Sequence, residues 1–369
     1  MSGTMNKISN MDEDFVSNMV LGFILLIAII MILYIIYLSR LEKKECDYMN
    51  DLYSVVDGNL KSLNANDVDC SGNLSEYYIK TAYNSCSGGS YKNDFVDLCN
   101  LKAVLKQGVR GLDFEIFSID NQPAVASSTQ DDVYIKETYN SVDFGSIMST
   151  IQNYAFSSST APNYLDPIVV HMRFMSNNQK MYTNLTTLLE SYSTILLGKD
   201  YSYENSGHNI GDEPIMNFMG KVIIVVDRTN SSFLENKDFM EYVNLTSNSM
   251  FMRAYKYNDV KNNPDIEELT EYNKRNMTIV FPDNGTDPNN PNITLCQAAG
   301  CQMVAMRYQY VDNYLLQNTS FFDNSGYAFT LKPQELRYVP VTIEEPIKQD
   351  PALSYETRNV TTDFYSYDF

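Results

Sequence analysis

Basic residues and cysteines are few in this chain, and tryptophan is absent. Lysine and arginine number 27 against 46 aspartates and glutamates, which gives a formal net charge of −19. Nucleic acids and anionic lipid surfaces both attract basic proteins, so this balance argues against either as a partner. Six cysteines in 369 residues are too few for a disulfide scaffold. The missing tryptophan accompanies many asparagines and tyrosines, which we interpret as a base-composition bias.

Hydrophobic residues are present in the proportion expected of a folded protein. They make up 44% of the chain, which is typical of globular domains and argues against disorder throughout. A length of 369 residues accommodates one large domain or two ordinary ones with a sizeable core.

The longest apolar run lies near the N-terminus. Residues 19–38, MVLGFILLIAIIMILYIIYL, contain no charged side chain. As a helix they would extend about 30 Å, the thickness of the hydrocarbon core of a bilayer. A cleaved signal peptide is the alternative, but its apolar region is shorter and ends at a small-residue site. We therefore predict a single-pass transmembrane helix at 19–38, in contact with the lipid bilayer, after an N-terminal tail of residues 1–18.

Two signals disagree about the side of the membrane on which the rest of the chain lies. Acidic residues 12–14 precede the apolar run, and Arg40, Lys43 and Lys44 follow it, so the positive-inside rule predicts the cytosolic face. Nine Asn-x-Ser/Thr sequons favour the opposite side, among them Asn73, Asn244, Asn292 and Asn359. Because sequons arise by chance in an asparagine-rich chain, we favour the cytosolic face and leave the other side open.

Strand-like and helix-like segments alternate after a charged juxtamembrane linker at residues 39–65. Apolar strands separated by helices indicate a parallel sheet, and hence an α/β fold or a barrel, which we place at residues 66–340. The predicted strands include 111–117, 166–174, 220–228, 277–282 and 302–309, with helices at 95–108 and 182–198.

The C-terminal residues 341–369 form an acidic tail that ends in TTDFYSYDF. A solvated tail is the simplest interpretation. The alternative is a docking peptide for a protein partner, because aromatic and acidic side chains are interleaved there.

Two carboxylates share one face of a predicted strand. In GLDFEIF (residues 111–117), Leu112, Phe114 and Ile116 alternate with Asp113 and Glu115, and residues two apart on a strand point the same way. Neighbouring acids repel each other unless water, a metal or a cation lies between them. The pattern therefore indicates a site at this strand.

Several ordered blocks of the sequence resemble the catalytic region of eukaryotic-type phosphoinositide-specific phospholipase C. The more specific blocks are QAAGCQMVAMRYQYVDNYLLQNTSFFDNSGYAFTLKPQELR (297–337) and EYNKRNMTIVFPDN upstream of it; the weaker ones are YYIKTAYNSC, LKQGVRGLDFEIF, DPIVVHMRF and PIMNFMGKVIIVV. The resemblance implies a distorted TIM-type barrel, with a first half at about 77–228 and a second half at about 240–337.

The resemblance also implies a catalytic Ca²⁺ held by four residues. Asn84, Asp113 and Glu115 fill three of those positions, but Arg173 stands where the fourth ligand, a carboxylate, is expected. A guanidinium repels Ca²⁺ and pairs well with carboxylates. We therefore expect Arg173 to replace the metal as counter-ion of the acidic pair, with no cofactor unless the enzyme interpretation holds.

The two histidines that the family uses for acid–base chemistry are missing. Their positions are occupied by Tyr83 and Ser127. The chain has only two histidines: His171, which we interpret as a packing residue in another strand, and His208, in a polar loop. The positions that bind inositol phosphates are also altered, and Arg228, Ile279, Phe281 and Tyr327 are what remains of the substrate pocket.

These changes favour a catalytically inactive, membrane-anchored phospholipase C-like barrel that acts as a structural or interaction module. Two alternatives stay open. One is an active phosphoric diester hydrolase of lipid metabolism that uses Tyr83, and the other is a lipid-headgroup-binding module. By analogy, the composition and the altered site suit a protein of a large DNA virus that links an internal virion membrane to the capsid. The pairing of the six cysteines is left open, and Cys301 is expected to be a buried free thiol.

Overall fold

The computed structural model describes residues 2–130, 134–202, 207–340, 353 and 357–368. The chain divides into two units, residues 1–337 and 338–369.

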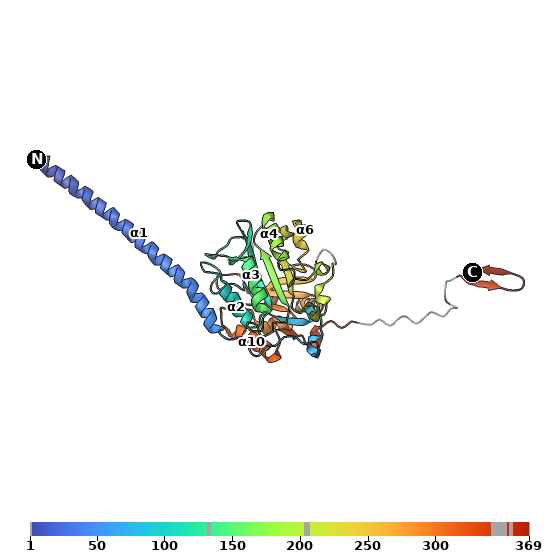
Figure 1. Cartoon of the computed structure of the whole chain (residues 1–369). Coiled ribbons are helices and arrows are strands. Elements are labelled where there is room, and N and C mark those ends of the chain that lie inside the picture. Colours follow the sequence, from blue (N-terminus) through green and yellow to red (C-terminus); the bar gives the residue numbers. More distant parts are fainter. Residues whose placement is uncertain (1, 131–133, 203–206, 341–352, 354–356, 369) are drawn as a thin grey trace. The chain divides into compact units, whose positions relative to one another are not determined.

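Eight parallel strands form a nearly closed barrel in the first unit (Figure 1). Around the barrel their order is β7-β6-β5-β2-β1-β10-β9-β8. Their bounds are β1 Tyr77–Ala82, β2 Gly111–Ile119, β5 Ile168–Phe174, β6 Val222–Asp227, β7 Leu245–Ser247, β8 Met252–Lys256, β9 Met277–Phe281 and β10 Met303–Met306. The end strands β7 and β8 contact each other, but no ladder of backbone hydrogen bonds joins them within the described residues. The prediction of a distorted TIM-type barrel is confirmed.

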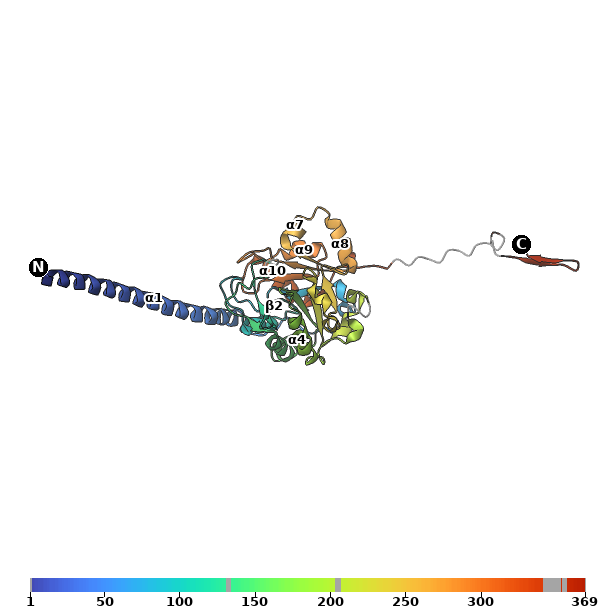
Figure 2. The ribbon, with the colours of Figure 1, turned by 90° about the horizontal axis from the view of Figure 1, so that it is seen from above.

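Short antiparallel strands extend the sheet, and helices cover its outer surface. The extra strands are β3 (Gln122–Ala126), β4 (Val142–Asp143) and β11 (Phe329–Leu331). The helices are α2 Leu98–Lys106, α3 Phe144–Thr150, α4 Gln179–Glu190, α6 Lys237–Met240, α7 Tyr257–Lys261, α8 Ile266–Arg275, α9 Ile293–Ala298 and α10 Asn313–Ser325. A π-helical turn at Ile151–Ala155 follows α3, and 3-10 turns lie at Val68–Cys70, Leu74–Glu76, Lys199–Tyr201, Ile210–Asp212, Ile215–Phe218, Ser231–Glu235 and Gln334–Leu336. Figure 2 shows α7, α8 and α9 on one side of the barrel and α4 on the opposite side.

The five predicted strands are all present, whereas the helix predicted at 182–198 is shorter than expected. It is α4, which ends at Glu190, and Ser191 and Tyr192 continue only as turns. The sequence after Glu190, SYSTI, is rich in hydroxyl and β-branched residues, which are weak helix formers. Local composition therefore ends this helix about two turns early.

Alternation along the strands separates an inner layer of side chains from an outer one. The inner layer of apolar residues includes Ile79, Val169, Ile223, Val225, Met277 and Ile279. The outer layer packs against the helices and includes Leu112, Phe114, Val170, Met172, Ile224 and Val280. Because Asp113 and Glu115 alternate with Leu112 and Phe114, their side chains are assigned to the inner layer.

The N-terminal helix α1 runs without interruption from Ser2 to Leu52. The described part of the chain contains one helix, from Phe15 onward, that is long and apolar enough to cross a membrane by length and composition. Its apolar side chains are exposed; Ile24 and Leu33, for example, are 56% and 60% exposed. The predicted span at 19–38 lies inside α1, and the predicted linker begins as a continuation of the same helix.

Residues 53–65 pack against the barrel and do not form a free linker. The hydroxyl of Tyr53 donates to the carbonyl oxygen of Tyr308 at 2.7 Å. Asp57 lies 3.5 Å from the buried ammonium group of Lys80 on β1, and the side chain of Leu63 is buried. The segment between α1 and β1 is therefore part of the first unit.

Most of the predicted acidic tail lies outside the described residues. The part that the structure describes contains an antiparallel hairpin of β12 (Asn359–Thr361) and β13 (Ser366–Asp368). Phe364 in its turn is 93% exposed.

A buried lysine lies just after β11, in the Leu-Lys-Pro segment of the second half. Lys332 is 2% exposed, and its ammonium group donates to the backbone oxygen of Asn273 at 2.8 Å. Burial lowers the pKa of Lys332 to about 7, and the neighbouring Cys301 and Glu76 only partly offset that effect.

This lysine should make stability depend on pH. Between about pH 7 and its ordinary pKa of 10.5, the unfolded chain holds a proton that the folded chain lacks, so stability rises with pH in this window. From pH 7 to 9 the rise should exceed that of Lys332→Met by up to about 2.5 kcal/mol. Urea unfolding of both proteins measures the difference, and equal pH slopes would refute it. The backbone oxygen of Asn273 keeps Gln302 as a second donor, so the variant leaves no unpaired group there.

Candidate functional site

The candidate site lies inside the barrel, toward the carboxyl ends of its strands. Asp113 and Glu115 of β2 are both fully buried. Parallel pairing with β5 places His171 beside Asp113 and Arg173 beside Glu115. These four polar side chains therefore share the inner layer because two neighbouring strands run in register.

The guanidinium group of Arg173 lies between the two acids. Its Nη2 donates to Oδ2 of Asp113 at 2.8 Å and its Nε donates to Oδ1 at 3.0 Å, which is the bidentate geometry of a strong ion pair. Its Nη1 lies 3.2 Å from Oε1 of Glu115. Arg173 is only 3% exposed, so a single buried cation serves both carboxylates.

Asn84 completes this cluster from the loop after β1. It adopts a left-handed backbone with φ of 41°, and its side-chain oxygen accepts from Nη2 of Arg173 at 2.8 Å. Its side-chain amide donates to Oε1 of Glu115 at 3.0 Å, and its backbone amide donates to Oδ2 of Asp113 at 3.2 Å. The remaining oxygen of Glu115 accepts from the hydroxyl of Ser128 at 2.6 Å. Every carboxylate oxygen of the pair therefore has a donor.

Sequence reasoning missed three members of the network: His171 as a site residue, and Ser128 and Ser247 altogether. Nδ1 of His171 lies 2.8 Å from Oδ1 of Asp113, and Nε2 lies 2.9 Å from the hydroxyl oxygen of Ser247 on β7. The signal for His171 was present, because it lies two residues before Arg173 on one strand and so shares its face. Ser247 had no such signal.

The Ser247–His171–Asp113 chain has the contact order of a serine hydrolase triad, but its surroundings differ. Ser247 is fully buried, so no substrate carbonyl could reach its hydroxyl. Arg173 also donates to Asp113 and already supplies a positive charge to that carboxylate. We therefore interpret the contacts among Ser247, His171 and Asp113 as a structural hydrogen-bond network.

Opposing effects act on the pKa of Asp113. Burial alone would raise it, but the charge of Arg173 and the hydrogen bonds from His171 and Arg173 outweigh burial and hold the pKa well below its usual range. A carboxyl whose folded pKa is lowered stabilises the fold above its ordinary pKa, near 3.9. That contribution is present at neutral pH and is lost only as pH falls below this value.

The donor set does not fit the Ca²⁺ that the sequence resemblance implies. Calcium needs six to eight oxygen ligands around an open centre. Here the three expected ligand residues, Asn84, Asp113 and Glu115, direct oxygens at one guanidinium group. A divalent cation at that centre would lie against the positive charge of Arg173, so we derive no metal chemistry for this site.

The two positions where the family has histidines hold groups of another kind. The Tyr83 ring is buried, lies edge-to-face against Tyr91 with centroids 5.3 Å apart, and contacts Phe281 at 5.7 Å. The guanidinium carbon of Arg173 lies over the rings of Tyr83 and Phe281 at 4.9 and 5.2 Å. The hydroxyl of Ser127 pairs with that of Ser87 at 2.7 Å. Aromatic rings thus cover the guanidinium.

Of the remaining predicted pocket residues, Phe281 lies at the cluster, whereas Tyr327 does not. Ile279 and Phe281 are buried in the inner layer, whereas Arg228 and His208 are exposed. The structure does not bring Tyr327 to the acidic pair: its hydroxyl donates to Asp67 at 2.6 Å, and β11, just after it, pairs with the first half of β1. Cys301 is a buried free thiol, as predicted.

Comparison with known proteins agrees with this architecture. Residues 222–335 match the family model described as phosphatidylinositol-specific phospholipase C, Y domain. Mouse inactive phospholipase C-like protein 2 is 24% identical over 314 residues, covering 72% of this chain and 27% of the relative. Human 1-phosphatidylinositol 4,5-bisphosphate phosphodiesterase beta-4 is 34% identical over 86 residues, covering 23% of this chain and 7% of the relative.

Solved structures show the same fold. PLC21 of S. officinalis superposes with a TM-score of 0.57 at 18% identity, and PLC21 of L. pealei with 0.59 at 18%. Each match covers 73% of this chain and 38% of the solved chain. The protein is a phospholipase C-like barrel. More specifically, residues 222–335 match the Y domain of phosphatidylinositol-specific phospholipase C, and the chain spans about a quarter of the length of the mouse relative that aligns over 314 residues.

Removing the buried cation should destabilise the barrel. Arg173→Gln leaves two buried carboxylates without a counter-ion, and breaking such a pair costs about 3–5 kcal/mol. Adding Asp113→Asn should recover part of that loss. Urea unfolding of the single and double variants measures both effects.

A surface ion pair provides the matched control. Arg253 makes a two-bonded pair with Glu268, whose side chain is 51% exposed. Arg253→Gln should cost less than about 1 kcal/mol. If Arg173→Gln costs no more than this control, the interior ion cluster does not have the role assigned to it.

Proposed function

We propose that this protein is a membrane-anchored, catalytically inactive phospholipase C-like barrel that acts as a structural or interaction module. The observation that carries the proposal is the position of Arg173. A positive side chain that donates to Asp113 and Asn84 and lies beside Glu115 takes the place of the metal that phosphodiester cleavage in this family requires.

The missing acid–base groups support the same conclusion. A ring hydroxyl and a serine stand at the positions of the two family histidines, and neither has the near-neutral pKa of an imidazole. Tyr83 is 5% exposed and covered by other rings, which argues against the alternative of a hydrolase that uses Tyr83. Two relatives over most of this chain carry the word inactive in their names.

A headgroup-binding role has less support. Phosphate recognition needs cations that face the site. Ile279 and Phe281 are apolar, and Arg228 is exposed just after the end of β6. Arg173, the cation between the two acids, is already paired with both of them.

The anchor and its setting are part of the proposal. The exposed apolar surface of α1 supports insertion into a bilayer, and the flanking charges predict a cytosolic barrel. The acidic tail, with the exposed ring of Phe364 in its hairpin, is the proposed contact for a protein partner. A virion membrane–capsid link is a prediction that rests on composition and analogy alone.

The direct test is a hydrolysis assay. The 369-residue chain in detergent micelles is incubated with phosphatidylinositol and its phosphorylated forms, with and without millimolar Ca²⁺, and soluble inositol phosphates are quantified by mass spectrometry. We expect no release above a protein-free control from a sample shown to be folded. Release that requires Ca²⁺ and disappears in Asp113→Asn would instead establish an active enzyme.

A second test asks whether Arg173 alone excludes the metal. Arg173→Glu supplies a fourth oxygen-bearing side chain to Asn84, Asp113 and Glu115, so we expect millimolar Ca²⁺ to raise its Tm by several degrees through mass action. Arg173→Gln removes the positive charge without adding a carboxylate and is the matched control. The wild-type chain should show no shift, and a Ca²⁺-dependent rise in its Tm would contradict the proposal whether or not the variants fold.

A further inference from the structure

The six cysteines fall into two chemical classes. Cys70, Cys86, Cys296 and Cys301 are buried free thiols. Burial raises the pKa of each of them, that of Cys301 to about 12. Because the thiolate is the reactive form, these four are inert at neutral pH. Cys46 and Cys99 are only half-buried and form a disulfide, so the thiol chemistry of the described chain concentrates at this pair.

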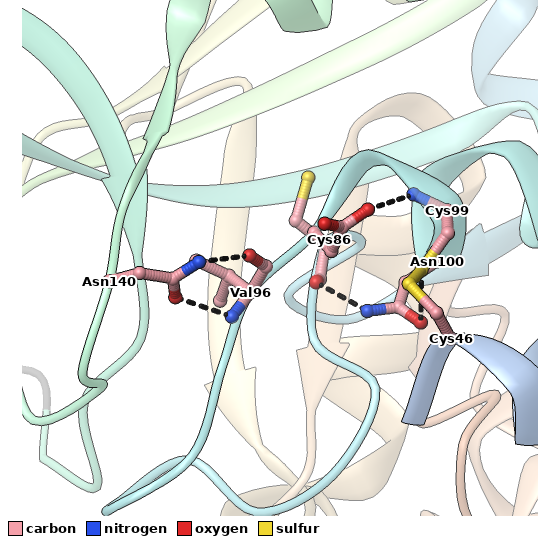
Figure 3. The surroundings of a disulfide bond; sticks show 7 residues. Cys46, Cys86, Val96, Cys99, Asn100 and Asn140 are labelled. Atoms are coloured by element: carbon pink, nitrogen blue, oxygen red, sulfur yellow. Dashed lines mark hydrogen bonds between the residues drawn. A yellow bond between two sulfur atoms is a disulfide. The ribbon is translucent and has the colours of Figure 1, made fainter. Parts of the chain in front are cut away.

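The disulfide joins the end of the apolar helix to the barrel. It links Cys46 of α1 to Cys99 in the first turn of α2, across 53 residues of sequence and with Cα atoms 5.7 Å apart. Figure 3 shows the two side chains meeting between these helices. Near the bond, α1 also contacts the barrel through Met49, which is fully buried in the core, and through Glu45, which lies beside Gly89.

The barrel side of the bond is held firmly. Asp97 caps α2 by accepting from the backbone amide of Cys99 at 2.6 Å, and Asn100 donates to the backbone oxygen of Cys86 at 2.9 Å. Asn140 both donates to and accepts from the backbone of Val96, at 2.8 and 2.9 Å. Figure 3 shows these bonds around the disulfide. If the disulfide opens, Cys99 stays in place and the end of α1 loses its covalent link, while Met49 and residues 53–65 still pack on the barrel.

The sequons indicate the compartment in which the pair resides. Three sequon asparagines are buried: Asn230 is 7%, Asn244 4% and Asn318 1% exposed. Asn230 donates to the backbone oxygen of Phe174 at 3.0 Å, and Asn244 donates to that of Tyr201 at 3.1 Å. A glycan on these side chains would prevent this fold, because glycans occupy surface positions. The fold is therefore suited to a compartment without N-glycosylation. The charges that flank the apolar run also predict the cytosolic side, and that prediction rests on the proposed anchor.

A disulfide on the cytosolic side is a conditional bond. Thiol reductants keep cytosolic cysteines reduced, and disulfides that do form there are usually transient or redox-sensing. The exposure of the two cysteines fits such a role, because neither residue is fully buried and a small thiol can approach the bond.

We propose that Cys46 and Cys99 form a reversible redox latch that fixes the barrel to the apolar helix when oxidised and loosens the end of α1 when reduced. Closing the latch forms one S–S bond between the two sulfurs. The two thiols give up two protons and two electrons to a small-molecule disulfide such as oxidised glutathione, which leaves as two thiols. Opening is the reverse exchange with a thiol reductant.

Hydrogen exchange on the 369-residue chain in detergent micelles tests the latch directly. Amide exchange of residues 42–52 is followed by mass spectrometry in oxidised glutathione and in dithiothreitol. We expect these amides to exchange at least about threefold faster after reduction, because local opening becomes less costly. Cys46→Ser should exchange at the fast rate in both conditions, and Cys86→Ser should behave like wild type. Equal rates for the oxidised and reduced wild type would overturn the latch.

Thiol labelling in cells tests reversibility. Free thiols are tagged with a maleimide polymer before and after treatment with a thiol oxidant, and the shift is compared with that of Cys46→Ser. We expect the pair to be reduced at rest and oxidised after treatment. A pair that is fully oxidised at rest, or a chain that carries N-glycans, would show an oxidising compartment and overturn the proposal. Neither readout involves hydrolysis, so failure here is distinguishable from failure of the proposed function.

Discussion

The pairing of one buried guanidinium with two buried carboxylates is the constraint on which the interior of this barrel depends. Asp113 and Glu115 are fully buried, and charges without partners are not tolerated there. Arg173 supplies the positive charge, and the network around it gives every carboxylate oxygen a donor. The register between β2 and β5 makes this geometry a consequence of sheet pairing, so the cluster is as fixed as the strands themselves.

The same cluster holds its two acids together through a side chain of the protein itself. A metal site holds its acids together through an ion that comes from solution, whereas a guanidinium does so as part of the chain. The rings of Tyr83 and Phe281 then cover the cation, at distances where cation–π attraction adds to the ion pairing. The outer faces of the strands pack against helices, so barrel packing does not depend on the cluster alone.

The apolar helix is joined to the barrel both by packing and by a covalent bond. Residues 53–65 pack on the barrel, through contacts such as Tyr53 with Tyr308 and Asp57 with Lys80, and the Cys46–Cys99 bond adds a covalent link. A packed connection of this kind transmits the position of α1 to the barrel.

The apolar helix and the five strands could be predicted from the sequence, because periodicity is a local property. The same holds for the departures from the family pattern at Tyr83, Ser127 and Arg173, because they are read from side-chain chemistry. It also indicated Arg173 as the partner of the acids, through one charge lost and one gained. Only the tertiary structure decided that Ser247 reaches His171 from 76 residues away, that Cys46 meets Cys99, and that Tyr327 lies apart from the acidic pair. Those contacts depend on strand order and on how segments distant in sequence pack, and no local pattern encodes either.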